Sequence, residues 1–210
     1  MEYNYRYPYF AILVIGILVG IYRYSKLMPA TRILVYLLAF TLLTEGVAYY
    51  LALVKVSNGL VYNLFMIVQP ILVGYTYIQE SSKLVIQIAL GVVTFLTIAF
   101  WWQISPAAFN SNGLVIVLVF LIMLPLNYFY QLLRKETEVP IQHFPLFWIS
   151  VGILLFGVLN IFNFGMINSL NSNNPFVAFL LANIGIYSNY FFYSLFIIAF
   201  SVPQNSLKTR

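Results

Sequence analysis

The chain has 210 residues, of which 62% are hydrophobic and only 7% are charged, and its formal net charge is +5. Charged residues make up about a quarter of an ordinary soluble domain, so this composition excludes the soluble class and predicts a membrane protein. The absence of cysteine from the sequence excludes disulfides and thiolate metal sites. A modest basic excess is usual in the loops of membrane proteins, and we infer no nucleic-acid partner from it.

Seven apolar segments are long enough to cross a bilayer as helices, which takes about 20 residues each. In chain order they are residues 8–24, 30–54, 59–79, 84–103, 113–133, 144–168 and 175–200. Stretches rich in Ser, Asn, Gly and Pro, notably residues 105–113 and 171–175, separate them. The sequence therefore predicts an all-α, polytopic integral membrane protein, a seven-transmembrane-helix bundle that forms one domain over residues 1–210.

The basic residues predict the orientation of this bundle. Eight of the ten fall on one side of the expected helices, namely Arg23, Lys26, Arg32, Lys83, Arg134, Lys135, Lys208 and Arg210. Only Arg6 and Lys55 fall on the other side. Because basic loops stay in the cytoplasm, we expect the N-terminus outside and the C-terminus in the cytoplasm. An odd number of helices requires the same arrangement.

Glu45 is the only charged residue that lies away from the ends of the apolar segments, within the otherwise uncharged run of residues 34–54. An ionised carboxylate at that depth is costly, so it marks a partner, a pathway or a ligand site. Because no Lys or Arg is expected at its depth, we expect Glu45 to be protonated at neutral pH.

Counting about 1.5 Å per residue along each helix places several polar side chains in the same outer layer as Glu45. The predicted layer consists of Glu45, Tyr49, Asn63, Gln69, Asn160, Asn163, Asn183 and Tyr187. One interpretation is a ligand pocket that opens outward with Glu45 at its base. The other is a set of interhelical hydrogen bonds that only fixes packing. We favour packing for the amides and function for Glu45. A deeper polar group, with Asn127, Gln131, Asn189 and Tyr193, is interpreted as structural.

The sequence contains no pattern typical of an enzyme. It has no nucleophile–base pair, Gly-rich phosphate loop or metal-binding motif, so we expect no catalytic activity, no metal and no cofactor. His143 is interpreted as a solvated loop residue. Gly16 and Gly20 form a small-xxx-small motif in the first expected helix, which could pack against a neighbouring helix or a second copy of the chain.

Residues 60–65 (LVYNLF), residues 146–152 (LFWISVG) and the helix around Glu45 resemble a group of small uncharacterised seven-helix membrane proteins common in Bacteroidota. The resemblance spans most of the chain and implies a multi-pass protein of a bacterial inner membrane. That group has no established activity to carry over. It often has an acid in the third helix where this chain has Gln69, so a mechanism that needs two acids does not transfer.

The first functional hypothesis is a signal-sensing or regulatory membrane protein. It would bind a small molecule or lipid in the outer polar layer and pass a helix rearrangement to a membrane or cytoplasmic protein partner. The second is a small transporter or proton-coupled carrier that uses Glu45, with Gln69 and Pro70 supplying a broken helix. The third is a structural or assembly subunit that makes its contact through Gly16 and Gly20.

Overall fold

Each apolar segment of the sequence folds as one helix in the computed structural model, which describes residues 6–78, 83–134, 139–169 and 175–203, without the side chains of residues 164–169, 175–178 and 182. The helices are α1 (Arg6–Tyr22), α2 (Pro29–Leu53), α3 (Gly59–Ile78), α4 (Lys83–Trp102), α5 (Ser111–Arg134), α6 (Pro145–Ser169) and α7 (Pro175–Ser201). Two short 3₁₀ turns, η1 (Tyr24–Lys26) and η2 (Ile141–His143), precede α2 and α6. These bounds confirm the predicted all-α class, and the described residues contain no strand.

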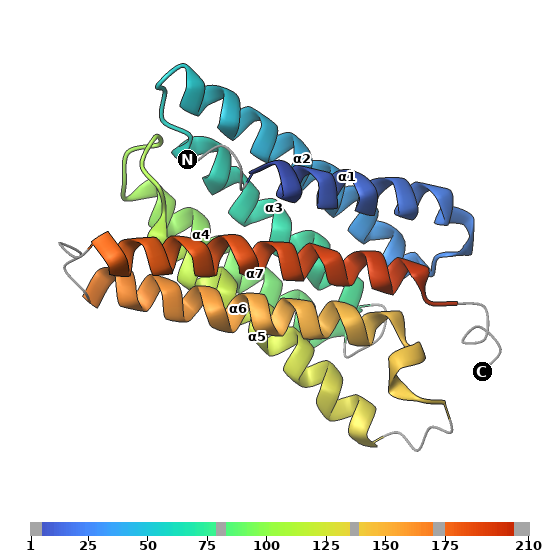
Figure 1. Ribbon diagram of the computed structural model, residues 1–210. Coiled ribbons are helices and arrows are strands. Elements are labelled where there is room, and N and C mark those ends of the chain that lie inside the picture. The colour runs from blue at the N-terminus through green and yellow to red at the C-terminus, as the bar shows by residue number, and fades with distance from the viewer. Residues whose placement is uncertain (1–5, 79–82, 135–138, 170–174, 204–210) are drawn as a thin grey trace.

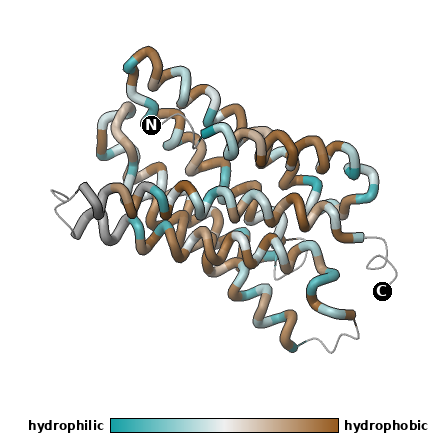
Figure 2. Tube along the Cα trace, viewed as in Figure 1, coloured by the Kyte–Doolittle hydropathy of each residue, from teal (hydrophilic) through white to brown (hydrophobic). Residues whose placement is uncertain are grey.

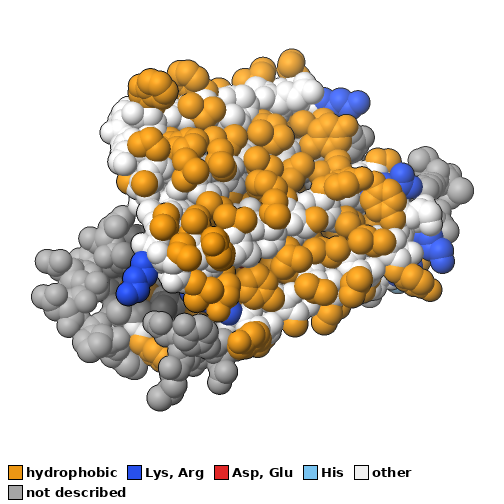
Figure 3. Space-filling view, turned by 90° about the horizontal axis from the view of Figure 1, so that it is seen from above, with side chains coloured by type: hydrophobic (Ala, Val, Ile, Leu, Met, Phe, Trp, Pro, Cys, Tyr) orange, Lys and Arg blue, Asp and Glu red, His pale blue; other side chains and the backbone are white. Residues whose placement is uncertain are grey.

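Six of the helices, α2 to α7, are long and apolar enough to cross a membrane, whereas α1 is a shorter apolar helix of 17 residues. Apolar residues run along the helices (Figure 2), and apolar side chains cover most of the outer face shown in Figure 3. Lys and Arg side chains gather at the ends of that face (Figure 3). This distribution is the one expected for a multi-pass membrane protein.

Proline marks the start of three of these helices. Pro29, Pro145 and Pro175 are the first residues of α2, α6 and α7, a position where the missing N–H costs no intrahelical hydrogen bond. The predicted loop at residues 171–175 lies mostly outside the described residues. Pro70 lies inside α3, which continues without interruption to Ile78. The expected broken helix at Gln69 and Pro70 is therefore wrong.

Each helix packs against its neighbours in the sequence (Figure 1). Helix α7 also packs against α1, and α3 packs against α5 as well as against α4. Helices α1 and α7 run in the same direction and finish at the same end of the bundle (Figure 1).

Gly16 and Gly20 hold α1 close to its neighbours. A Cβ added to Gly16 would lie 2.9 Å from Leu38 of α2, and one added to Gly20 would lie 2.7 Å from Val35 of α2 and 3.3 Å from Phe200 of α7. Both glycines are buried. Of the two alternatives for the small-xxx-small motif, the structure shows packing against neighbouring helices of the same chain.

The loop between α4 and α5 is fastened over the start of α3. The backbone carbonyl of Ala107 accepts a hydrogen bond from the Ser57 hydroxyl at 2.6 Å. A Cβ added to Gly59 would lie 2.2 Å from the same carbonyl oxygen. Only glycine lets the first turn of α3 come this close to the loop.

We predict that Gly59→Ala destabilises the protein, because its methyl group would meet backbone that cannot move aside cheaply, at a cost of roughly 1–3 kcal/mol. The matched control is Gly91→Ala in α4, where an added Cβ meets nothing within 4 Å. That control should be neutral or gain up to about 1 kcal/mol from helix propensity. Unfolding in mixed micelles followed by circular dichroism measures both, and equal stability of the two variants would contradict the prediction.

Candidate functional site

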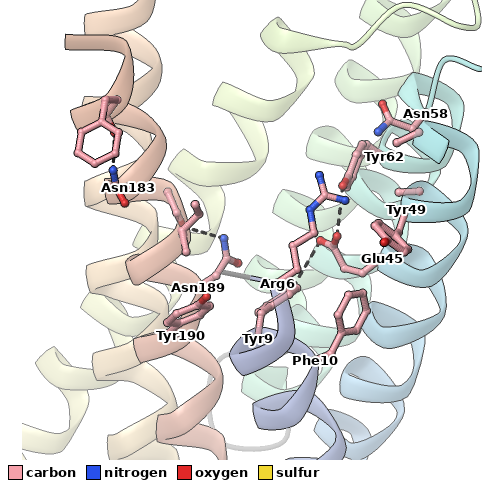
Figure 4. A pocket seen from close by; sticks show the side chains of 15 residues that line it. Arg6, Tyr9, Phe10, Glu45, Tyr49, Asn58, Tyr62, Asn183, Asn189 and Tyr190 are labelled. Carbon is pink, nitrogen blue, oxygen red and sulfur yellow. Dashed lines mark hydrogen bonds between the residues drawn. The ribbon is translucent and has the colours of Figure 1, made fainter. Parts of the chain in front are cut away.

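A cavity of about 690 Å³ lies beside Glu45, at the end of the bundle where α1 begins (Figure 4). Helices α1, α2, α3 and α7, with Asn58 just before α3, form its walls. It is lined by Arg6, Tyr9, Phe10, Glu45, Ala48, Tyr49, Ala52, Asn58, Tyr62, Phe179, Asn183, Gly185, Ile186, Asn189 and Tyr190.

Helical spacing explains why these residues share one space. Side chains three, four and seven positions apart lie on one face of a helix. Helix α2 presents Glu45, Tyr49 and Ala52 at such intervals, and α7 presents Asn183, Ile186 and Tyr190 likewise. Alanines on α2 and Gly185 on α7 leave room between the helices.

Two tyrosine hydroxyls donate hydrogen bonds to the Glu45 carboxylate. The Tyr9 hydroxyl donates to Oε1 at 3.4 Å, and the Tyr62 hydroxyl donates to Oε2 at 3.2 Å. Tyr9 belongs to α1 and Tyr62 to α3, so each carboxylate oxygen is held from a different neighbouring helix. Below them the ring of Tyr9 packs against the buried ring of Tyr193, with centroids 5.8 Å apart.

Arg6 is the basic residue of the cavity. Its guanidinium lies 5.1 Å from the centre of the Tyr49 ring, and it is close enough to Glu45 and Tyr62 to act on both electrostatically (Figure 4). No direct ion pair joins Arg6 to Glu45. The expectation that no basic side chain shares the level of Glu45 is therefore wrong. That expectation was the reason for predicting a protonated Glu45, so the prediction loses its basis.

A signal in the sequence could have located Arg6. It lies sixteen residues before Tyr22, where α1 ends, and Glu45 lies sixteen residues after Pro29, where α2 begins. Because the two helices are antiparallel and joined by a short turn, equal counts place the two side chains at equal heights.

The two asparagines of α7 direct their amide nitrogens away from a ligand. Asn183 Nδ2 donates to the Phe179 carbonyl at 2.7 Å, and Asn189 Nδ2 donates to the Gly185 carbonyl at 2.8 Å. Among the described residues their amide oxygens accept no hydrogen bond. Asn189 was expected in a deeper polar group, and its place in this cavity corrects that expectation.

The predicted polar layer divides into two sets. Glu45, Tyr49 and Asn183 line the cavity, whereas five other members do not. Those five are Asn63, Gln69, Asn160, Asn163 and Tyr187. Three residues that act directly on Glu45 were not predicted from the sequence: Arg6, Tyr9 and Tyr62.

Asn63 belongs to the fastening of the α4–α5 loop. Its Nδ2 donates to the Ala108 carbonyl at 2.8 Å, and its Oδ1 accepts from the Asn110 backbone N–H at 3.0 Å. Asn110 in turn donates through Nδ2 to the Thr97 carbonyl at 2.9 Å. This buried network holds the loop to α3 and α4.

The other amides of the layer lie in helix contacts. Asn160 donates to the Phe156 carbonyl and to the Ser188 hydroxyl at 3.2 Å, which links α6 to α7. Asn163 is buried, and its Oδ1 has no hydrogen-bond partner among the described residues. Gln69 is buried in α3. Tyr187 is 56% exposed and packs edge-on against Tyr190.

No protein-family model matches the chain, and comparisons with curated proteins and with solved structures found no match. In the described part of the chain, no three side chains of His, Cys, Asp or Glu come together as metal ligands. The chemistry that the cavity offers is one acid, one guanidinium, aromatic faces and amide oxygens.

We predict that Asn63→Leu lowers the free energy of unfolding by roughly 1–3 kcal/mol, because it leaves the buried Asn110 N–H without an acceptor. Asn183→Leu is the matched control. Its side chain is only half-buried and bonds within its own helix, so we expect a change within about 0.5 kcal/mol. Chemical unfolding in micelles compares them, and a larger loss for Asn183→Leu would reverse the assignment of the two amides.

Proposed function

We propose that this protein is a signal-sensing or regulatory seven-helix protein of a bacterial inner membrane, which binds a small molecule or lipid in the cavity around Glu45. The observation that carries the proposal is the cavity itself. Its volume of about 690 Å³ lies within the range of ligand pockets, roughly 300–1,000 Å³. It also combines apolar walls with a few polar groups, as ligand sites do.

In the proposed orientation the cavity opens toward the outside. All seven helices, α1 included, cross the membrane, the N-terminus is outside and the C-terminus is cytoplasmic. Arg23, Lys26 and Arg32 lie at the join of α1 and α2, at the opposite end of these helices from the cavity. A basic end in the cytoplasm agrees with the positive-inside rule.

The contact between α1 and α7 gives a route by which ligand binding would reach the inner end. Both helices line the cavity and pack against each other. At the inner end the Arg23 guanidinium, just after α1, donates to the carbonyl of Ser201 at the end of α7. A shift of α1 at the cavity would therefore alter the contact between Arg23 and Ser201 on the cytoplasmic side. A membrane or cytoplasmic partner would bind differently to the altered surface.

The two alternatives have less support. A proton-coupled carrier would use Glu45 as its titrating group, but α3 continues through Pro70 and offers no broken helix. Proteoliposome uptake driven by a pH gradient would favour the carrier. An assembly subunit cannot use Gly16 and Gly20, which are occupied within the chain; a stoichiometric partner on purification would favour that role.

Labelling of single introduced cysteines tests the predicted orientation. The result is unambiguous because the chain has no cysteine of its own. Val56→Cys lies in the exposed loop after α2, and Ser25→Cys lies in the exposed turn η1. A membrane-impermeant maleimide added to intact spheroplasts should label Val56→Cys and label Ser25→Cys only after permeabilisation. The reverse pattern would invert the topology.

We also predict that a bulky side chain at the mouth of the cavity displaces a bound molecule. Ala52→Trp would project into the cavity, and Ala11→Trp places the same bulk on an exposed part of α1. Mass spectrometry of protein in nanodiscs should find a retained small molecule or lipid in wild type and Ala11→Trp but not in Ala52→Trp. Identical bound species in all three would contradict binding in this cavity.

A further inference from the structure

The hydrogen-bond inventory around Glu45 leaves acceptors for a ligand that donates. The hydroxyl protons of Tyr9 and Tyr62 are given to Glu45, and the amide nitrogens of Asn183 and Asn189 are bonded to carbonyls of their own helix. The acceptors left for a ligand are the carboxylate and the two amide oxygens, and the donors left include Arg6, the Tyr49 hydroxyl and the Asn58 amide. Arg6 is the only donor-only side chain in the lining.

The aromatic walls suit the same kind of ligand. Tyr9 and Phe10 have ring centroids 6.0 Å apart, and Phe10 meets Tyr49 edge-on at 6.5 Å. Aromatic faces attract ammonium and guanidinium groups through their electron-rich centres, and more strongly where water is excluded. Arg6 already uses this attraction on Tyr49, at 5.1 Å.

The charge balance of the cavity points in the same direction. One arginine and one glutamate face it, so the pair is neutral overall. If an external cation replaces Arg6 beside Glu45, the cavity stays neutral and Arg6 moves to the outer interface. An anion bound beside Glu45 would instead add a second negative charge at low dielectric, which is costly.

We propose that the cavity binds an organic cation, an ammonium or guanidinium group with an apolar substituent, and that Arg6 is an internal occupant which this ligand displaces. The cationic group would lie between the Glu45 carboxylate and the Tyr49 ring. The apolar part would lie against Phe10, Phe179 and Ile186. This inference rests on the proposed function and adds the chemical class of the ligand.

Displacement of Arg6 by a ligand would loosen the contact between the start of α1 and α2. Arg6 is the first residue of α1, three residues before Tyr9, which holds Glu45. A cation that takes the place of Arg6 removes one of the contacts by which the start of α1 is held against α2. Ligand binding is thereby coupled to the position of α1.

The test uses the full chain in nanodiscs of phosphatidylglycerol, which carries no cationic headgroup. Isothermal titration calorimetry compares 3-phenylpropylammonium with the neutral 3-phenylpropanol and the anionic 3-phenylpropionate, which share one apolar part. We expect the ammonium to bind at least about tenfold more tightly than the other two, which corresponds to a modest cation–π and charge contribution.

Variants then separate two effects on ligand affinity: competition from Arg6 and attraction by Glu45. Arg6→Ala should bind the ammonium about tenfold more tightly, because its internal competitor is gone. A gain of affinity cannot arise from misfolding. Glu45→Gln should lose the preference for the ammonium. Arg32→Ala is the matched control, because Arg32 also lies over a tyrosine, 5.3 Å from the Tyr24 ring, but at the inner end; it should bind as wild type does.

The outcomes distinguish this inference from the proposed function. If 3-phenylpropionate binds best, if Arg6→Ala weakens binding, or if 3-phenylpropanol binds as tightly as the ammonium, the cation inference is wrong while a ligand site remains. If no probe and no lipid binds wild type or Arg6→Ala, both proposals fail. Repeating the titration with phosphatidylethanolamine in the nanodiscs assigns the source: a weakened ammonium affinity identifies the lipid headgroup, and an unchanged affinity identifies a soluble amine.

Discussion

A carboxylate within an apolar bundle must find its partners in the protein, because the lipid offers none. Glu45 finds them on both helices beside α2: Tyr9 on α1 and Tyr62 on α3. The long tyrosine side chains reach the acid from a distance, while small residues such as Ala48 stand next to it on α2. The same arrangement therefore satisfies the charge, fixes α1 and α3 around α2, and leaves open space beside the acid.

The start of α3 serves two neighbouring regions at once. Tyr62 turns toward Glu45, whereas the adjacent Asn63 holds the α4–α5 loop through Ala108 and Asn110. Phe109 of that loop packs edge-on against the Tyr62 ring, with centroids 6.5 Å apart. The buried amide does not touch the cavity, but it holds the loop that supports one of the two tyrosines on Glu45. Polar residues at one depth thus differ in role according to the face of the helix they occupy.

Hydropathy along the chain was sufficient to predict the seven helices, because they depend only on position along the sequence. It could not predict how each helix is rotated or which helices meet. Asn63 and Asn160 were predicted to share a layer with Glu45, but they bond to the α4–α5 loop and to Ser188. Asn189 was assigned to another group because nothing in the sequence reveals that α7 packs against α1. Arg6 was placed in the aqueous flank because of its charge alone.

The level of Arg6 on the first helix accounts for the cation in the cavity. With 17 residues, α1 is about 25 Å long, less than the roughly 30 Å of a hydrocarbon core. Helix α2 continues eight residues beyond Glu45 to Leu53, a further rise of about 12 Å. Ala52 and Asn58 line the cavity beyond the level of Glu45. Arg6 on α1 is level with Glu45 on the neighbouring helix, so its guanidinium faces the same space as the acid.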